Sequence, residues 1–144
     1  MKVKLILTLN AITVSMFLVA CATSGQKAWV EVSCNEFYDN HHINTMLEVQ
    51  VGETFEVKLC SNPTTGFQWL EKAQISDTAV LKQEDHKFIG PESEPPPPPG
   101  TPGQETWTFE ALKRGSSEVY LEYSQPWEGG KKGEWMCTVN VIVK

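Results

Sequence analysis

Apolar and polar residues alternate with a period of two along most of the chain that follows residue 28. In the segment 55–60, Phe55, Val57 and Leu59 lie on one face of an extended chain, and the residues between them lie on the other. This pattern is typical of a β-strand with one buried face, whereas a helix would show a period of 3.6. The predicted strands cover residues 29–34, 47–51, 55–60, 67–70, 106–111, 119–123 and 135–143, with weaker candidates at 80–81 and 87–89.

The same pattern predicts the class of fold. No segment has the periodicity of a long amphipathic helix, and residues 75–83 allow one helical turn at most. The chain lacks the Cys…Trp…Cys spacing of antibody domains and contains no internal repeats. Seven or eight short strands separated by turns favour an all-β sandwich, in which two sheets pack face to face.

The first 20 residues differ from the rest, because they contain two lysines, no acidic residue and 14 apolar residues. Lys2 and Lys4 precede the apolar run 5–20, which is the layout of a secretory signal peptide. The run leads into LVAC at residues 18–21, which resembles a bacterial lipobox, where the signal is removed and the cysteine is lipid-modified. An uncleaved membrane anchor is the alternative, although the run is short for a span of about 20 residues.

This interpretation divides the chain into a signal peptide at 1–20, a lipidated tether at 21–28 and one domain at 29–144. We expect an exported, extracytoplasmic protein that is lipid-anchored to the cell envelope through Cys21. Without the signal peptide, 124 residues carry 10 basic and 18 acidic side chains, a charge of −8, compared with −6 for all 144 residues. This acidic balance argues against a nucleic-acid partner.

The four cysteines include no CxxC pair, so a structural zinc site is not expected. Lipidation of Cys21 would leave an odd number of thiols. Cys34 and Cys60 each lie at the end of a predicted strand, and export permits disulfides, so we predict a bond between these two. Cys137 lies on the apolar face of the last predicted strand, where a buried thiol behaves as a small hydrophobic side chain.

Residue types suited to catalysis or metal binding are present but form no recognisable site. Cys60 could be combined with His41, His42 or His86 and an asparagine, as in a cysteine hydrolase, but no helix N-terminus lowers the pKa of its thiol. Two adjacent histidines would face opposite ways on a strand, and no third metal ligand is evident. We therefore expect neither an enzyme nor a metal or cofactor site.

Two predicted loops combine rigidity with potential contact residues. In the segment 62–67, Asn62 can cap its own turn, Pro63 fixes φ and Gly66 permits a positive φ, so two threonines would stand at a stiff tip. In the segment 124–130, a tryptophan follows a proline, and a loop tryptophan is a frequent binding anchor. The alternative for each loop is an ordinary hairpin turn.

A third segment, 90–103, contains five consecutive prolines at 95–99 and ends in Gly-Thr-Pro-Gly. Prolines cannot donate the hydrogen bonds of a central strand, and a run of them favours a polyproline II conformation. Three interpretations remain open: a solvated insertion, a ligand for SH3-like domains, or a stiffened binding loop.

Taken in order, NPTTGFQW at 62–69, GTPG at 100–103 and QPWE at 125–128 resemble the chagasin-like inhibitors of papain-family cysteine proteases. The resemblance covers essentially residues 45–144. It implies an immunoglobulin-like β-sandwich of seven to eight strands, in which three loops at one end fill the active-site cleft of the protease. It also implies a reversible inhibitor whose partner is a papain-family cysteine protease, and we expect a monomer.

The resemblance places the protease-binding residues on the three loops, with the Thr64-Thr65 tip nearest the catalytic cysteine of the target. The family usually has an arginine before the Pro-Trp pair, and Gln125 in its place removes one charged contact. The implied contact residues are Asn62, Pro63, Thr64, Thr65, Gly66, Phe67, Gly100, Thr101, Pro102, Gly103, Gln125, Pro126, Trp127 and Glu128.

Two other functions stay open at the level of the sequence. One is a non-inhibitory immunoglobulin-like envelope lipoprotein used for adhesion or scaffolding, and the other is a hydrolase that depends on Cys60. The residues favour inhibition, because a wedge needs rigid loops and a complementary shape rather than an acid–base pair. Preformed turns also limit the conformational entropy that is lost on docking.

Overall fold

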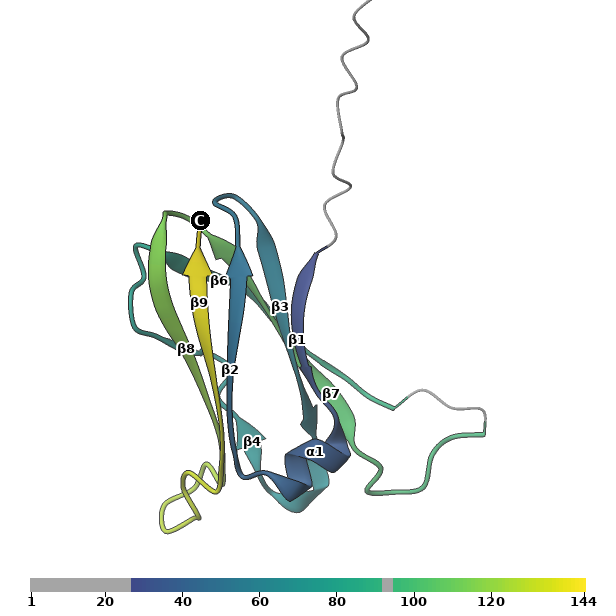
Figure 1. Ribbon diagram of the computed structural model, residues 1–144. Helices are drawn as coiled ribbons and strands as arrows, with labels where there is room; N and C mark the ends of the chain where they lie inside the picture. Colours follow the sequence, from purple (N-terminus) through teal and green to yellow (C-terminus); the bar gives the residue numbers. More distant parts are fainter. Residues whose placement is uncertain (1–26, 92–94) are drawn as a thin grey trace, which may run out of the picture.

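The computed structural model describes residues 27–91 and 95–144, which form two β-sheets packed face to face (Figure 1). The elements are β1 (Ala28–Val32), α1 (Cys34–Asp39), β2 (His42–Val49), β3 (Thr54–Ser61), the 3-10 turn η1 (Pro63–Thr65), β4 (Gln68–Trp69), β5 (Gln74–Ile75), β6 (Leu81–Ile89), β7 (Gly103–Ala111), β8 (Gly115–Ser124) and β9 (Trp135–Val143). The predicted β-sandwich is confirmed, with nine strands in the described ranges, two of which are only two residues long.

The N-terminal predictions concern a different part of the chain. The signal peptide at 1–20 and the lipidation site Cys21 both lie outside the described residues. Within residues 27–91 and 95–144, no helix combines the length and the hydrophobicity needed to span a membrane.

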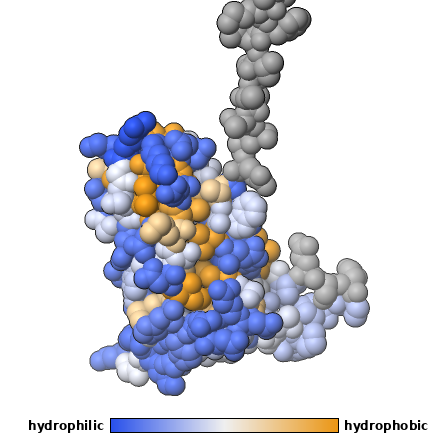
Figure 2. All heavy atoms as spheres, viewed as in Figure 1, coloured by the Kyte–Doolittle hydropathy of each residue, from blue (hydrophilic) through white to orange (hydrophobic). Residues whose placement is uncertain are grey.

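The two sheets differ in strand order, but in each of them one edge strand runs parallel to its neighbour. The first has the order β1-β3-β7-β6 and the second β2-β9-β8-β4, with β5 also pairing β8. β1 runs parallel to β3 and β2 runs parallel to β9, whereas the other pairs are antiparallel. β1 and β2 are therefore edge strands, and they lie along one side of the sandwich (Figure 1). Hydrophobic residues gather in a band on that side, while the end that carries α1 is covered by hydrophilic residues (Figure 2).

Alternating residues of the strands meet in a shared core. Phe55, Val57 and Leu59 of β3 are fully buried, and Val139 and Val141 of β9 are buried in the same cluster. Burying a side chain of this size contributes about 1.5–3 kcal/mol, and a slip of one residue would turn a whole strand's apolar face to water. The alternation in the sequence therefore fixes the register of the strands as well as their positions.

The single described free thiol belongs to this core. Cys137 is fully buried in β9, and its burial raises the pKa of the thiol to about 12. The thiolate is the reactive form, so this cysteine is chemically inert at neutral pH. The prediction of a core thiol is confirmed.

The helix α1, which the sequence analysis missed, closes one end of the sandwich (Figure 1). Its N-terminus is capped by Ser33, whose Oγ accepts a hydrogen bond from the backbone N of Glu36 at 3.2 Å. The fully buried ring of Phe37 packs on Tyr123 and on Trp135, with centroid distances of 5.3 Å to each. One short helix thus packs an aromatic side chain against three rings of the second sheet.

The predicted disulfide is present and holds this helix. Cys34, the first residue of α1, is bonded to Cys60 near the end of β3. The two residues are 26 positions apart in the sequence, and the bond therefore closes a loop that contains α1, β2 and most of β3. It ties the helical end cap directly to the first sheet.

β6 departs from the prediction of two short strands at 80–81 and 87–89. It is one continuous strand, Leu81–Ile89, with a register shift against β7 between Gln83 and Asp85. An edge strand has solvent on one side, and a bulge changes which face each side chain takes. The polar stretch in the middle of β6 therefore breaks the alternation of apolar and polar residues, and the sequence pattern does not predict a single strand. β2 likewise starts earlier than predicted, at His42.

We predict that replacing both Cys34 and Cys60 with alanine lowers the free energy of unfolding by about 3 kcal/mol. The physical reason is the loop-closure entropy that the crosslink removes from the unfolded chain. Chemical denaturation of the wild type and the double variant, with and without a thiol reductant, measures the difference. The reductant should destabilise the wild type alone, and an equal midpoint for oxidised and reduced wild type would contradict the prediction.

Candidate functional site

The three sequence-predicted loops lie at the end of the sandwich that carries α1 (Figure 1). We call residues 62–67 the first loop, the described residues 95–102 the second loop and residues 125–133 the third loop. Two contacts connect them. The side-chain Nδ2 of Asn62 donates to the backbone O of Gly100 at 2.8 Å, and the ring of Trp127 lies directly over Gly66. The first loop is therefore the central one, with the others attached to its two ends.

The first loop is built around the side chain of Asn62. Its Oδ1 accepts from the backbone N of Thr64 at 3.2 Å and from the Thr64 hydroxyl at 2.6 Å. The hydroxyl of Thr65 donates to the backbone O of Asn62 at 2.7 Å, and Gly66 ends the 3-10 turn with a φ of 80°. Both threonines are exposed, yet both hydroxyls donate back into the loop. The tip therefore presents methyl groups and backbone in a fixed conformation.

An aromatic base supports this loop. The hydroxyl of Tyr123 accepts from the backbone N of Asn62 at 3.0 Å and donates to its backbone O at 3.1 Å. The ring of Phe67 stacks on that of Tyr123 with a centroid distance of 5.6 Å and meets Trp135 edge-on at 5.3 Å. Phe67, predicted as a contact residue, is thus half-buried and anchors the loop to the sandwich.

The third loop presents Trp127, whose ring remains 50% exposed. Gln125 closes the loop, because its backbone N donates to the O of Lys131 at 2.8 Å and its Oε1 accepts from the N of Lys131 at 3.0 Å. The Nζ of Lys132 donates to the backbone O atoms of Gln125 and Trp127. The carboxamide of Gln125 therefore points into its own loop, which is a structural use for a residue that the sequence analysis assigned to partner contact.

Glu122 holds the base of the third loop. Its Oε1 accepts from the backbone N of Gly133 at 2.9 Å and from the hydroxyl of Ser124. The hydrogen bond from Ser124 is the largest of the interactions that lower the pKa of Glu122 below its ordinary value. The carboxylate is therefore ionised at neutral pH, when it can accept both bonds. Pro126 and Glu128 are exposed.

The second loop is tied at its end to the first. The backbone N and the hydroxyl of Thr101 donate to the O of Pro98, at 3.2 and 2.7 Å. Most of the proline run is exposed, and it extends away from the body of the sandwich (Figure 1). Gly100 is exposed and Pro102 is half-buried. These residues can contact a partner through the side of the loop that faces away from Asn62.

The structure corrects the prediction that Gly103 is a contact residue, because Gly103 does not belong to the loop surface. It is buried at the start of β7, where it pairs with Ser61. A Cβ atom at this position would collide with the ring of Phe88 and with the backbone O of Ile89. Glycine is required here by close packing inside the sheet, so this residue cannot reach a partner.

The residues that could have supported catalysis have other roles. Cys60 is in a disulfide and so has no free thiol. The ring of His41 packs against Trp135 at a centroid distance of 4.9 Å, and Nε2 of His86 lies 2.7 Å from a carboxylate oxygen of Glu105. In the described ranges, no three His, Cys, Asp or Glu residues are grouped so that they could hold a metal ion.

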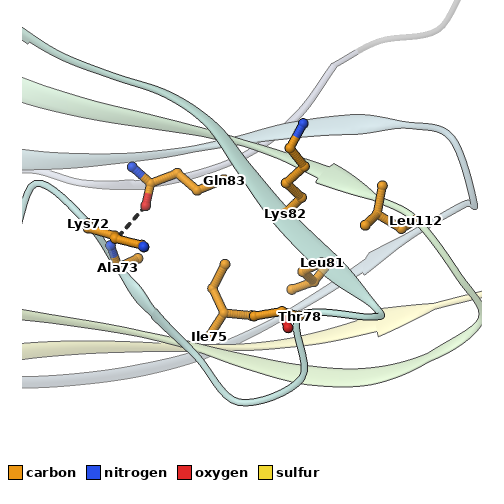
Figure 3. A pocket seen from close by; sticks show the side chains of 8 residues that line it. All are labelled: Lys72, Ala73, Ile75, Thr78, Leu81, Lys82, Gln83 and Leu112. Carbon is orange, nitrogen blue, oxygen red and sulfur yellow. Dashed lines mark hydrogen bonds between the residues drawn. The ribbon is translucent and has the colours of Figure 1, made fainter.

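A pocket of about 450 Å³ opens elsewhere, on the flank between β5 and β6 (Figure 3). Ile75, Leu81 and Leu112 give it an apolar surface, and Lys72 and Lys82 lie beside it. None of its lining residues belongs to the three loops. It is therefore separate from the loop end and adds nothing to the candidate site.

Comparison with known proteins shows which proteins the chain resembles. The family model described as chagasin family peptidase inhibitor I42 matches residues 48–141. The chain is 33% identical to Chagasin of Trypanosoma cruzi over 90 residues, which cover 61% of this chain and 79% of that protein. It is 29% identical to Amoebiasin-2 of Entamoeba histolytica over 117 residues, or 77% of this chain and 92% of that protein.

Solved structures show the same fold. The cysteine protease inhibitor EhICP2 from Entamoeba histolytica superposes with a TM-score of 0.58 at 23% identity, covering 72% of this chain and 95% of that one. The structure of PbICP-C in complex with falcipain-2 also gives a TM-score of 0.58, at 14% identity, covering 81% of this chain and 99% of that one. At these identities the likeness establishes the fold.

We predict that Gly66→Ala displaces Trp127 and destabilises the protein more than Gly129→Ala does. Both glycines have a positive φ, of 80° and 75°, so both variants share a backbone cost of about 1–2 kcal/mol. Only at Gly66 would the added Cβ lie 2.8 Å from the Trp127 ring, whereas nothing lies within 4 Å at Gly129. Denaturation midpoints and the NMR resonance of the Trp127 indole N–H measure the two effects.

Gly129→Ala is the matched control in this comparison, because it carries the backbone strain without the ring contact. Equal losses of stability in the two variants, together with an unshifted Trp127 resonance in Gly66→Ala, would show that the first and third loops are not coupled through this contact.

Proposed function

The chain belongs to the chagasin family of peptidase inhibitors, and we propose that it is a reversible inhibitor of papain-like cysteine proteases. The family establishes inhibition of cysteine proteases as the class of function and excludes an enzyme. The finer proposal is that the first, second and third loops together fill the active-site cleft of the target.

The observation that carries the proposal is the connection of the three loops into one edge. The Asn62–Gly100 hydrogen bond and the packing of Trp127 on Gly66 join segments that are far apart in the sequence. Because the edge exists before binding, little conformational entropy is lost when a cleft closes around it. All the parts come from one chain, which agrees with a monomeric inhibitor.

The chemistry of the tip favours blocking a nucleophile rather than supplying one. The hydroxyls of Thr64 and Thr65 are both used as donors within the loop, so neither is available as a base-activated nucleophile. Residues 63–65 form a 3-10 turn, whereas a protease cleaves a peptide that lies extended along its cleft. A compact turn of small side chains can therefore occupy the space near a catalytic cysteine without presenting a peptide bond for attack.

Trp127 is the expected anchor of the third loop. A half-exposed indole at the edge of a rigid loop can bury a large area against the rim of a cleft, and tryptophan is enriched among residues that dominate binding energy. Its ring already packs on Gly66 of the first loop in the free protein. The ring therefore does not have to be ordered at the moment of binding.

We predict that the purified protein inhibits papain and that Trp127→Ala raises the inhibition constant at least about tenfold, equivalent to about 1.4 kcal/mol. The matched control is Trp29→Ala, because Trp29 on β1 is 51% exposed, compared with 50% for Trp127. Steady-state titration of papain activity measures both variants, and recovery of activity on dilution tests reversibility.

The control should inhibit as the wild type does, because β1 lies outside the three loops. An absence of inhibition at micromolar concentration would instead favour the adhesion or scaffolding alternative. Equal inhibition by wild type and Trp127→Ala would show that the third loop does not bind the cleft.

The proposal extends to where the inhibitor acts. The LVAC motif at 18–21 and the preceding apolar run support export and lipid attachment at Cys21, which would hold the inhibitor at the cell envelope. We predict that full-length protein expressed in a bacterium fractionates with membranes and carries acyl groups on Cys21 by mass spectrometry. Cys21→Ser should lack the acyl mass and leave the membrane fraction, and an unchanged distribution would contradict the anchor.

A further inference from the structure

The inner face of the first sheet is apolar along most of β7 and carries an acidic side chain near the loop end. Along β7, the side chains of Trp107, Phe109 and Ala111 are fully buried in the core. The next inward position toward the loops is occupied by Glu105, which is only 8% exposed. A carboxylate at such a position is unusual, because charged groups are seldom buried without partners.

Glu105 has two internal partners from neighbouring strands. The hydroxyl of Ser61 on β3 donates to its Oε1 at 2.6 Å, and Nε2 of His86 on β6 lies 2.7 Å from its Oε2. The His86 ring in turn stacks on Trp107 with a centroid distance of 4.8 Å. Each carboxylate oxygen has two lone pairs, so both oxygens can still accept a further donor.

The Glu105 carboxylate borders a pocket of about 270 Å³ beside the first loop. Three aromatic residues, Phe67, Trp69 and Phe88, line it, together with a second acidic residue, Glu71. The two residues of β4, Gln68 and Trp69, both belong to its lining. Among the described residues that line it, His86 is the one basic side chain, and its Nε2 already contacts Glu105.

We propose that this pocket, which we call the cation pocket, binds the guanidinium of an arginine side chain from the target protease. Two carboxylates supply acceptors for a planar cation, and the aromatic rings supply faces on which it can stack. The inference rests on the proposed function, because it names a contact that lies beside the cleft-filling loops. It assigns to Glu71, Phe88 and Glu105 a role in selecting targets that carry an arginine at the rim of the cleft.

The first test uses the free protein and ethylguanidinium as the probe, with neutral ethylurea as its control. In an NMR titration, ethylguanidinium should give saturable shifts at the amides of Phe67, His86 and Phe88, whereas ethylurea should not. Glu71→Gln and Phe88→Ala, at exposed positions, should weaken binding at least about threefold. Glu118→Gln, at an exposed position of β8 on the other sheet, should leave binding unchanged.

The proposal is overturned if ethylguanidinium gives no saturable shifts, if ethylurea binds equally well, or if the two pocket variants bind as the wild type does. Because this titration needs no protease, its result is independent of whether the chain inhibits one. A failure of inhibition against papain would therefore not be confused with a failure of the cation pocket.

The second test addresses the protease itself. For an inhibited papain-like protease, each arginine on the rim of its cleft is replaced by alanine, and inhibition constants are measured with wild type and Glu71→Gln. One arginine should show coupling, so that its loss and the loss of Glu71 together cost less than the two separate effects combined. Strictly additive effects at every rim arginine would exclude the proposed contact.

Discussion

The arrangement of the loop end depends on the hydrogen bonds of a single residue, Asn62. Its backbone N and O are both bound to the hydroxyl of Tyr123, so the loop is fixed to the sandwich at that point. Its Oδ1 holds Thr64 and its Nδ2 holds Gly100, which requires an acceptor and a donor on the same side chain. Aspartate could cap the turn but could not donate to Gly100, and serine could not do both at this distance. The two hydrogen bonds of the Asn62 side chain therefore require an amide at this position, independently of any contact with a partner.

The stiffness of the first loop is transmitted from the core through aromatic packing. Tyr123, whose hydroxyl binds Asn62, is itself packed between Phe37 of α1 and Phe67. α1 is held in place by the bond from Cys34 to β3. The order of dependence therefore runs from the disulfide through the helix to the aromatic base and then to the loop tip. Buried rings therefore fix where the first loop stands, and the hydrogen bonds of Asn62 fix its shape.

Strand positions could be predicted from the sequence wherever alternation is unbroken, as in β9, which spans the predicted residues 135–143. The first loop was also predictable, because Asn-Pro and the glycine that follows have strong local preferences. α1 was missed since six residues give no helical period, although the Ser33-x-x-Glu36 pattern is a capping signal that could have indicated it. The side-chain roles of Gln125 and Gly103 depend on residues that become neighbours only through the fold, and no local pattern contains that information.

Glu105 occupies a position of β7 where the alternation predicts an apolar side chain, and no sequence motif marks it. It is the one charged residue at an inward position of β7, and it meets Ser61 and His86 only through strand pairing. Stability alone does not account for it, because replacing a buried ion pair or polar cluster with apolar residues is often neutral or stabilising. Phe67 belongs both to the wall of the cation pocket and to the end of the first loop. An arginine bound there would therefore press against the same ring that supports the tip, so that target selection and cleft filling would act through one shared side chain.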